Sequence, residues 1–125
     1  MSQKKIPKKS FLFFLQQPPH ASLKNKEALD FALSCAAFEQ KVSVIFIDDG
    51  VYQLIKNQNT KNIHSKNHSA SIAALALYGI EHCYYDGESA QSRKLSTEKL
   101  IADTQTITQD HIKHLIAEHD FVFYY

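Results

Sequence analysis

The chain has 125 residues, which is enough for one domain of ordinary size and too few for two. Hydrophobic residues make up 44% and charged residues 22%, a balance typical of a chain that buries a core and not of a disordered one. The longest apolar runs, Phe11–Leu15 and Ile72–Tyr78, are far shorter than the roughly 20 residues of a membrane helix, so we expect no membrane span.

The net charge of +1 depends on four lysines that precede Ser10, namely Lys4, Lys5, Lys8 and Lys9. Without them, ten basic residues stand against thirteen acidic ones, and the remaining chain carries a charge of −3. Such a surface offers no basic patch for a phosphate backbone, so we expect no direct binding of nucleic acid. We expect residues 1–9 to form a flexible basic N-terminus and residues 10–125 to form a single domain.

The start of the chain does not resemble a secretory signal, because five apolar residues are too few and Gln16-Gln17-Pro18-Pro19 is no small-residue cleavage site. We therefore expect a cytoplasmic protein. Cys35 and Cys83 are far apart and lack partners at metal-ligand spacing, which predicts reduced thiols and neither a disulfide framework nor a zinc site.

The first half of the chain predicts two buried strands joined by a helix. Ser10–Leu15 and Val42–Ile47 are short unbroken apolar runs, as expected of strands covered on both faces. Between them, Asn25–Glu39 is rich in helix formers and apolar over most of its circumference. After the second strand, Asp48–Gly50 indicates a turn, and Val51–Ile55 is compatible with a helical turn.

The second half continues the alternation. The polar stretch Lys56–His68 predicts an exposed, mobile loop, and Ser69–Tyr78 predicts a second helix that ends at Gly79. Ile80–Tyr85 is a third strand candidate, followed by a short polar helix or loop over Gly87–Leu95. Three elements close the chain: a short strand at Gln105–Ile107, a helix capped by Thr108 that runs to about Glu118, and a strand at Phe121–Tyr124.

Alternation of buried strands with helices predicts an α/β fold with a mostly parallel sheet of about five strands and helices on both faces. Function in such sheets lies at the carboxyl ends of the strands, which directs attention to Gln16–Leu23, Asp48–Leu54 and Asp86–Ser92. The helices expected at Asn25–Glu39 and Ser69–Tyr78 have almost no polar face, so one sheet cannot cover them and a partner chain is expected.

Few residues form patterns typical of a cofactor or metal site. The three glycines, Gly50, Gly79 and Gly87, have no phosphate-binding spacing, so we expect no nucleotide cofactor. Asp48 and Asp49 at a strand end could hold a magnesium ion, although carboxylates are also ordinary turn residues.

Two histidine pairs have spacings that place both rings on one face of a helix. They are His64 with His68 and His111 with His114. The first pair falls in a predicted loop and the second on a surface helix, so we expect no metal ion at either.

Cys83 lies inside the third predicted strand. Two interpretations stay open: a small core residue, or a thiolate that carries sulfur as a persulfide. Cys35, on an apolar helix stripe, is expected to be a packing residue.

The run Phe46–Leu54, Phe-Ile-Asp-Asp-Gly-Val-Tyr-Gln-Leu, resembles the TusC/DsrF family, whose members are subunits of DsrE-DsrF-DsrH sulfur-relay complexes. The resemblance covers nearly the whole chain from Ser10. Its further matches are Pro19-His20-Ala21, Glu27-Ala28-Leu29-Asp30, Leu75-Ala76-Leu77-Tyr78-Gly79-Ile80-Glu81, and Asp120-Phe121-Val122 with Tyr124.

This resemblance implies a DsrE-like three-layer sandwich and a heterohexamer with TusB-like and TusD-like subunits. Such a complex takes persulfide sulfur from TusA and passes it to TusE for 2-thiolation of the wobble uridine of tRNA. The cargo is sulfur, and no cofactor or direct contact with tRNA is implied.

The resemblance also implies that the working cysteine belongs to the TusD-like subunit, at the start of the helix after strand three. Aligning Ser89–Lys94 with the family's Ser-Leu-x-x-Arg-Gly places Asp86 at that position, although Ala90 and Lys94 depart from the pattern. A carboxylate cannot hold a persulfide, so we expect a structural subunit without a catalytic residue of its own.

Three alternatives stay open at this point. The chain could carry sulfur itself through Cys83, or it could be a DsrF-like subunit in sulfur oxidation. It could also be a metal- or phosphate-responsive regulator that uses Asp48 and Asp49.

Overall fold

A computed structural model of the chain describes residues 7–19, 23–55, 72, 75–80, 82–100 and 104–125. Its centre is a five-stranded sheet in the order β4-β3-β2-β1-β5, and every neighbouring pair is parallel. The strands are β1 (Ser10–Leu15), β2 (Lys41–Phe46), β3 (His82–Asp86), β4 (Gln105–Ile107) and β5 (Phe121–Tyr124). The strand positions predicted from apolar runs are thus confirmed to within a residue or two.

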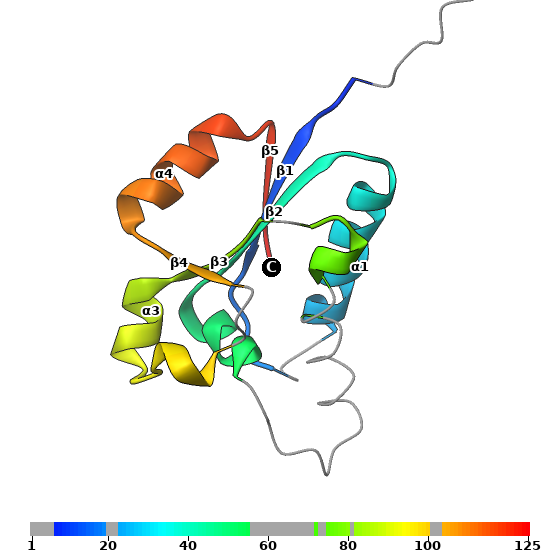
Figure 1. Cartoon of the computed structure of the whole chain (residues 1–125). Coiled ribbons are helices and arrows are strands. Elements are labelled where there is room, and N and C mark those ends of the chain that lie inside the picture. Colours follow the sequence, from blue (N-terminus) through cyan, green and yellow to red (C-terminus); the bar gives the residue numbers. More distant parts are fainter. Residues whose placement is uncertain (1–6, 20–22, 56–71, 73–74, 81, 101–103) are drawn as a thin grey trace, which may run out of the picture.

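Helices cover both faces of the sheet (Figure 1). Helix α1 (Lys24–Ala37) lies on one face and α4 (Gln109–Glu118) on the other, so the predicted three-layer α/β sandwich is confirmed. Shorter elements connect these layers: the 3-10 helices η1 (Asp48–Leu54), η2 (Leu75–Tyr78) and η3 (Thr97–Lys99), and the helix α3 (Gly87–Ser92). None of the helices in the described ranges is long and apolar enough to cross a membrane.

Alternation along the strands divides the buried side chains between two cores. In β1, Phe13 and Leu15 join the core beneath α1, whereas Leu12 and Phe14 join the core beneath α4. Every one of these four side chains is buried, which explains why the run has no polar residue. Thr108 accepts a hydrogen bond from the His111 N–H and caps α4, as its position predicts.

Both segments predicted as apolar helices leave large side chains exposed. In α1, Ala28, Leu29 and Ala32 are buried, but Phe31 and the C-cap residue Phe38 stay exposed. Of the predicted helix Ser69–Tyr78, the structure describes residue 72 and η2, in which Leu77 is 86% exposed. The chain therefore does not cover these side chains itself, in line with the expected need for a partner.

Two further predictions concern residues outside the described ranges. They are the loop at Lys56–His68 and most of the basic N-terminus, residues 1–6.

Candidate functional site

The loops singled out at the carboxyl ends of the strands meet in the structure. Asp48, which follows β2, donates its N–H to Ser89 Oγ of α3 at 2.9 Å. Gln53 of η1 donates from Nε2 to the carbonyl oxygen of Gln17, beyond β1, at 2.8 Å. Three segments far apart in sequence are thus joined by hydrogen bonds beyond the carboxyl ends of the strands, as expected for a parallel sheet.

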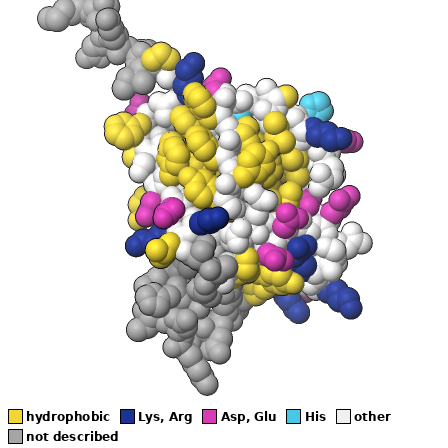
Figure 2. Space-filling view, turned by 180° about the vertical axis from the view of Figure 1, so that it is seen from behind, with side chains coloured by type: hydrophobic (Ala, Val, Ile, Leu, Met, Phe, Trp, Pro, Cys, Tyr) yellow, Lys and Arg dark blue, Asp and Glu magenta, His cyan; other side chains and the backbone are white. Residues whose placement is uncertain are grey.

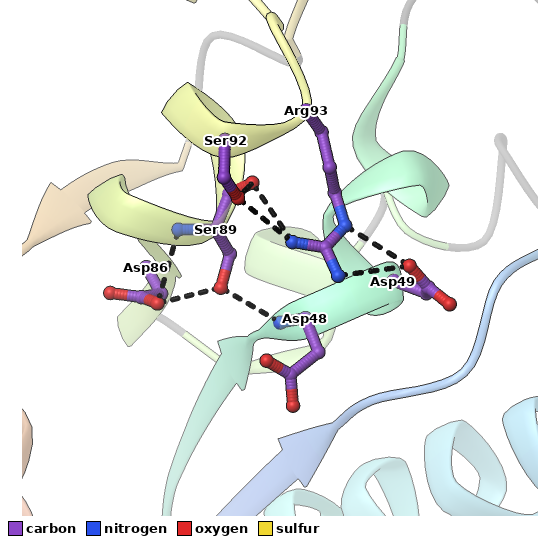
Figure 3. A network of polar contacts seen from close by, with 6 residues as sticks. All are labelled: Asp48, Asp49, Asp86, Ser89, Ser92 and Arg93. Carbon is purple, nitrogen blue, oxygen red and sulfur yellow. Dashed lines mark hydrogen bonds and ion pairs between the residues drawn. The ribbon is translucent and has the colours of Figure 1, made fainter.

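Asp86 is the buried acceptor in a polar cluster at these carboxyl ends (Figure 3). The Asp86 cluster consists of Asp48, Asp49, Asp86, Ser89, Ser92 and Arg93. It ends β3 and caps α3: its Oδ2 accepts from Ser89 Oγ at 2.6 Å and from Ser89 N–H at 3.2 Å. Its other oxygen, Oδ1, accepts from Nε2 of Gln109 in α4 at 3.3 Å. A carboxylate with both oxygens engaged is a satisfied cap that joins β3, α3 and α4.

Ser89 holds the centre of the cluster because a hydroxyl can donate and accept at once. Its Oγ donates to Asp86 and accepts from Asp48 N–H, and both partners lie within 3 Å. The Asp48 backbone has φ of +54°, a left-handed conformation that Asp tolerates better than most residues. In this conformation, the N–H of Asp48 donates its hydrogen bond to Ser89 Oγ.

Arg93 closes the cluster on its outer side. Its Nε and Nη2 both lie 3.0 Å from Oδ1 of Asp49, and its Nη1 donates to the Ser89 carbonyl oxygen and to Ser92 Oγ at 3.2 Å. Because the Asp49 side chain is 53% exposed, we expect this ion pair to contribute about 1 kcal/mol or less. Arg93 therefore serves mainly to fix the last turn of α3 against η1.

Gly50 and Gln53 explain why the segment after β2 packs so closely on β1. A Cβ at position 50 would lie 1.8 Å from the Leu15 carbonyl oxygen, so only glycine fits. The fully buried Gln53 also donates to Oδ1 of Asn25, whose amide donates to the Pro18 carbonyl oxygen. The resemblance included Gly50 and Gln53 in its motif without a role, and Asn25 had no signal in the sequence at all.

Neither thiol belongs to the cluster. Cys83 and Cys35 are both buried in the core beneath α1, whereas Asp86 bonds to α4 on the other face of the sheet. Burial raises the pKa of the Cys35 thiol, which lowers the fraction of reactive thiolate. The packing interpretation of Cys35 thus agrees with its position, and the sulfur-carrier candidate Cys83 lies in the same core.

The candidate metal ligands do not gather. Figure 3 shows the carboxylates of Asp48 and Asp49 pointing apart, with Asp49 engaged by Arg93. His111 and His114 are exposed on α4, and the His111 ring packs edge-on against Tyr84 with centroids 5.6 Å apart. His64 and His68 lie outside the described residues. Among the residues described, no group of three or more His, Cys, Asp or Glu could hold a metal ion.

Comparison with known proteins identifies the family. The sequence model of the DsrE/DsrF-like family matches residues 9–125, almost the entire chain. The chain belongs to the DsrE/DsrF-like family.

Curated DsrE/DsrF-like relatives narrow this assignment. The chain is 39% identical over 93 residues to the intracellular sulfur oxidation protein DsrF of Allochromatium vinosum, covering 74% of this chain and 68% of that protein. It is 30% identical over 113 residues to a protein named TusC homolog from Pseudomonas aeruginosa, covering 90% and 95%. These relatives confirm the resemblance to TusC and DsrF and place the chain in a family of sulfur-relay subunits.

A solved structure supports the DsrE/DsrF-like fold. The crystal structure of the ychN protein from E. coli superposes with a TM-score of 0.81, covering 94% of this chain and 99% of that one. At 15% sequence identity this likeness concerns the fold alone.

Proposed function

We propose that this chain is a structural subunit, without a sulfur-carrying residue of its own, of a cytoplasmic TusBCD-like complex. With TusB-like and TusD-like chains it forms a heterohexamer that takes persulfide sulfur from TusA and passes it to TusE. The sulfur serves the 2-thiolation of the wobble uridine of tRNA. The relatives named TusC homolog support this proposal, and so do the exposed side chains of Phe38, which follows α1, and Leu77 of η2.

The observation that carries the non-catalytic assignment is the chemistry of position 86. The resemblance puts the relay cysteine of a related subunit at the start of the helix after strand three, where this chain has Asp86. A persulfide forms on a thiolate sulfur, and the Asp86 carboxylate is instead engaged by Ser89 and Gln109. No side chain of the Asp86 cluster offers a sulfur atom.

Co-expression tests the assembly. The chain and its TusB-like and TusD-like counterparts from the same organism should elute as one stable heteromer, with the wild-type chain and with a Cys35→Ser/Cys83→Ser chain alike. Separate elution of all three chains would contradict the proposal.

Intact-mass analysis tests the absence of a sulfur-carrying residue. After incubation with a persulfide donor, the folded chain should gain no sulfur adduct, because both of its thiols are buried. A +32 Da adduct, about the mass of one sulfur atom, that Cys83→Ser removes and Cys35→Ser retains would make Cys83 a carrier instead.

The second candidate function is a DsrF-like role in sulfur oxidation. The 39% identity to the intracellular sulfur oxidation protein DsrF favours it. Deletion of the gene separates the two candidate functions, since only the tRNA pathway predicts a loss of thiolated wobble uridine.

A regulator that senses magnesium or phosphate through Asp48 and Asp49 has less support. Arg93 holds Oδ1 of Asp49, and its positive charge opposes the binding of a cation beside it. Calorimetric titration with magnesium should give no binding heat.

A further inference from the structure

Strand β5 forms an open edge of the sheet. It pairs with β1, and no other strand of the described chain lies on its outer side. Tyr125 donates its N–H to the Phe14 carbonyl oxygen at 2.9 Å and accepts the Gln16 N–H at 2.8 Å, and alternate residues of a parallel strand face opposite ways. Counting back from Tyr125, the backbone groups of Phe121 and Phe123 point toward β1, whereas those of Val122 and Tyr124 point away from it and can pair with another strand.

Aromatic rings line both faces of this edge. On the α1 side, Phe121 stacks on Phe11 with centroids 5.1 Å apart, and Phe123 packs against Phe31 at the same distance. On the α4 side, Tyr124 stacks on Phe14 at 4.9 Å. The rings are held in place by their neighbours, so they present a preformed surface.

Much of this aromatic surface is exposed. Tyr124 is 62% exposed, Phe121 45% and Phe31 38%, and Ile116 of α4 flanks the other face. In the view of Figure 2, hydrophobic side chains gather near the centre of the surface in two fields, separated by a strip of backbone and other atoms. We define the edge patch by its members: Phe31, Ile116, Phe121, Val122, Phe123 and Tyr124.

The area of the edge patch is that of an interaction surface. With about 200 Å² for each aromatic side chain, the exposed parts of Tyr124, Phe121 and Phe31 amount to about 300 Å². This apolar area, divided between the two faces of the edge, matches the lower end of the largest patches on soluble monomers, which are often functional contacts. It supplies more than a third of the roughly 800 Å² that each partner buries in a standard interface, before the backbone and half-buried neighbours are added.

The sequence of the edge lacks the usual protection against pairing. Edge strands are commonly guarded by lysine, proline or a bulge, yet Phe121–Tyr124 contains no charged residue and no proline. All six members of the edge patch are uncharged, so two identical copies meet there without repulsion between like charges.

We propose that the edge patch joins two copies of this chain through antiparallel pairing of β5 with β5. A two-fold axis normal to the sheet reverses the strand direction and keeps each face on its own side. The aromatic rings beneath α1 then meet their equivalents, as do Tyr124 and Ile116 beside α4. Pairing continues the five-stranded sheet across the axis and satisfies the outward backbone groups of both edges.

Sedimentation analysis of the purified full chain tests the proposal. From about 1 to about 100 µM, the weight-average mass should rise from the chain mass of 14.3 kDa toward twice that value. Phe121→Lys and Tyr124→Lys place like charges across the axis and should weaken dimerisation at least about tenfold. Leu77→Lys makes the same change at an exposed residue of η2, away from β5, and should leave the dimer unchanged.

Two results would overturn the proposal. One is a monomer at all concentrations; the other is a dimer that Leu77→Lys weakens as much as the β5 variants do. Circular dichroism confirms that each variant is folded.

The inference is independent of the proposed function. A monomeric chain that still joins TusB-like and TusD-like partners refutes only the β5 dimer. If the β5 variants instead abolish that heteromer, the edge patch holds a different subunit and the second-copy proposal fails.

Discussion

Replacement of Gly50 by alanine tests how tightly the segment after β2 is seated on β1. The new Cβ would lie 1.8 Å from the Leu15 carbonyl oxygen and 2.7 Å from its carbonyl carbon. Both atoms are backbone, and the oxygen also accepts the Ile47 N–H at 3.0 Å. Reaching an ordinary contact therefore requires a backbone shift of more than about 1 Å inside a packed core.

The expected cost lies at the upper end of that for overpacking, about 3 kcal/mol of unfolding free energy. For 125 residues, at about 2 cal/mol/K of unfolding entropy per residue, this lowers the Tm by roughly 10 °C. Thermal and urea unfolding followed by circular dichroism measure both quantities.

Gly87→Ala is the matched control for this substitution. A Cβ at position 87 first meets Oγ1 of Thr106 at 2.9 Å, the end of an exposed side chain that can rotate. We expect a change within about 1 kcal/mol of either sign. Equal destabilisation by the two variants would refute the close packing of Gly50 on the Leu15 carbonyl group of β1.

Three further predictions concern buried or hydrogen-bonded groups. Gln53→Met leaves the Gln17 carbonyl oxygen and Asn25 Oδ1 without the donor Nε2 of Gln53 and should lower the unfolding free energy by about 2–4 kcal/mol. The control Gln91→Met, at an exposed position, should change it by less than about 0.5 kcal/mol, and urea unfolding measures both. Hydrogen bonds from Ser10 N–H and Oγ lower the pKa of Asp120, so the ionised carboxylate stabilises the fold above its unfolded pKa, and this contribution is lost as the pH falls through the acid range. Asp120→Asn should therefore flatten the decrease of the unfolding free energy at acid pH. An unchanged decrease in the variant would contradict this prediction. Because burial raises the pKa of Cys35, iodoacetamide should alkylate it much more slowly in the native chain than in urea.

The sequence predicts the sheet well because its strands are covered on both faces. Ser10–Leu15 is an unbroken apolar run, and only a strand buried under two layers tolerates a run without a polar residue. The same reasoning identified the carboxyl edge of the sheet, where Asp48 and Ser89 meet.

The polar contacts of the candidate site could not be predicted in the same way. Arg93 and Asp49 are 44 positions apart, and nothing in their local sequence links one to the other. Asn25 lies at a helix start, where an exposed side chain is the ordinary expectation, but it is buried by its bonds to Pro18 and Gln53. Such pairings depend on how separate segments pack together at the carboxyl ends of the strands, and the residue pattern within one segment does not specify its partner in another.

Thiolation of tRNA tests the central claim that the chain works in a sulfur relay without a thiol of its own. The gene is deleted in the source organism and restored as wild type or as Cys35→Ser/Cys83→Ser, and 2-thiouridine derivatives are measured by nucleoside mass spectrometry of bulk tRNA. The account predicts that deletion lowers the wobble-uridine thiolation and that both versions restore it. Unchanged thiolation after deletion, or rescue by the wild type alone, would contradict it.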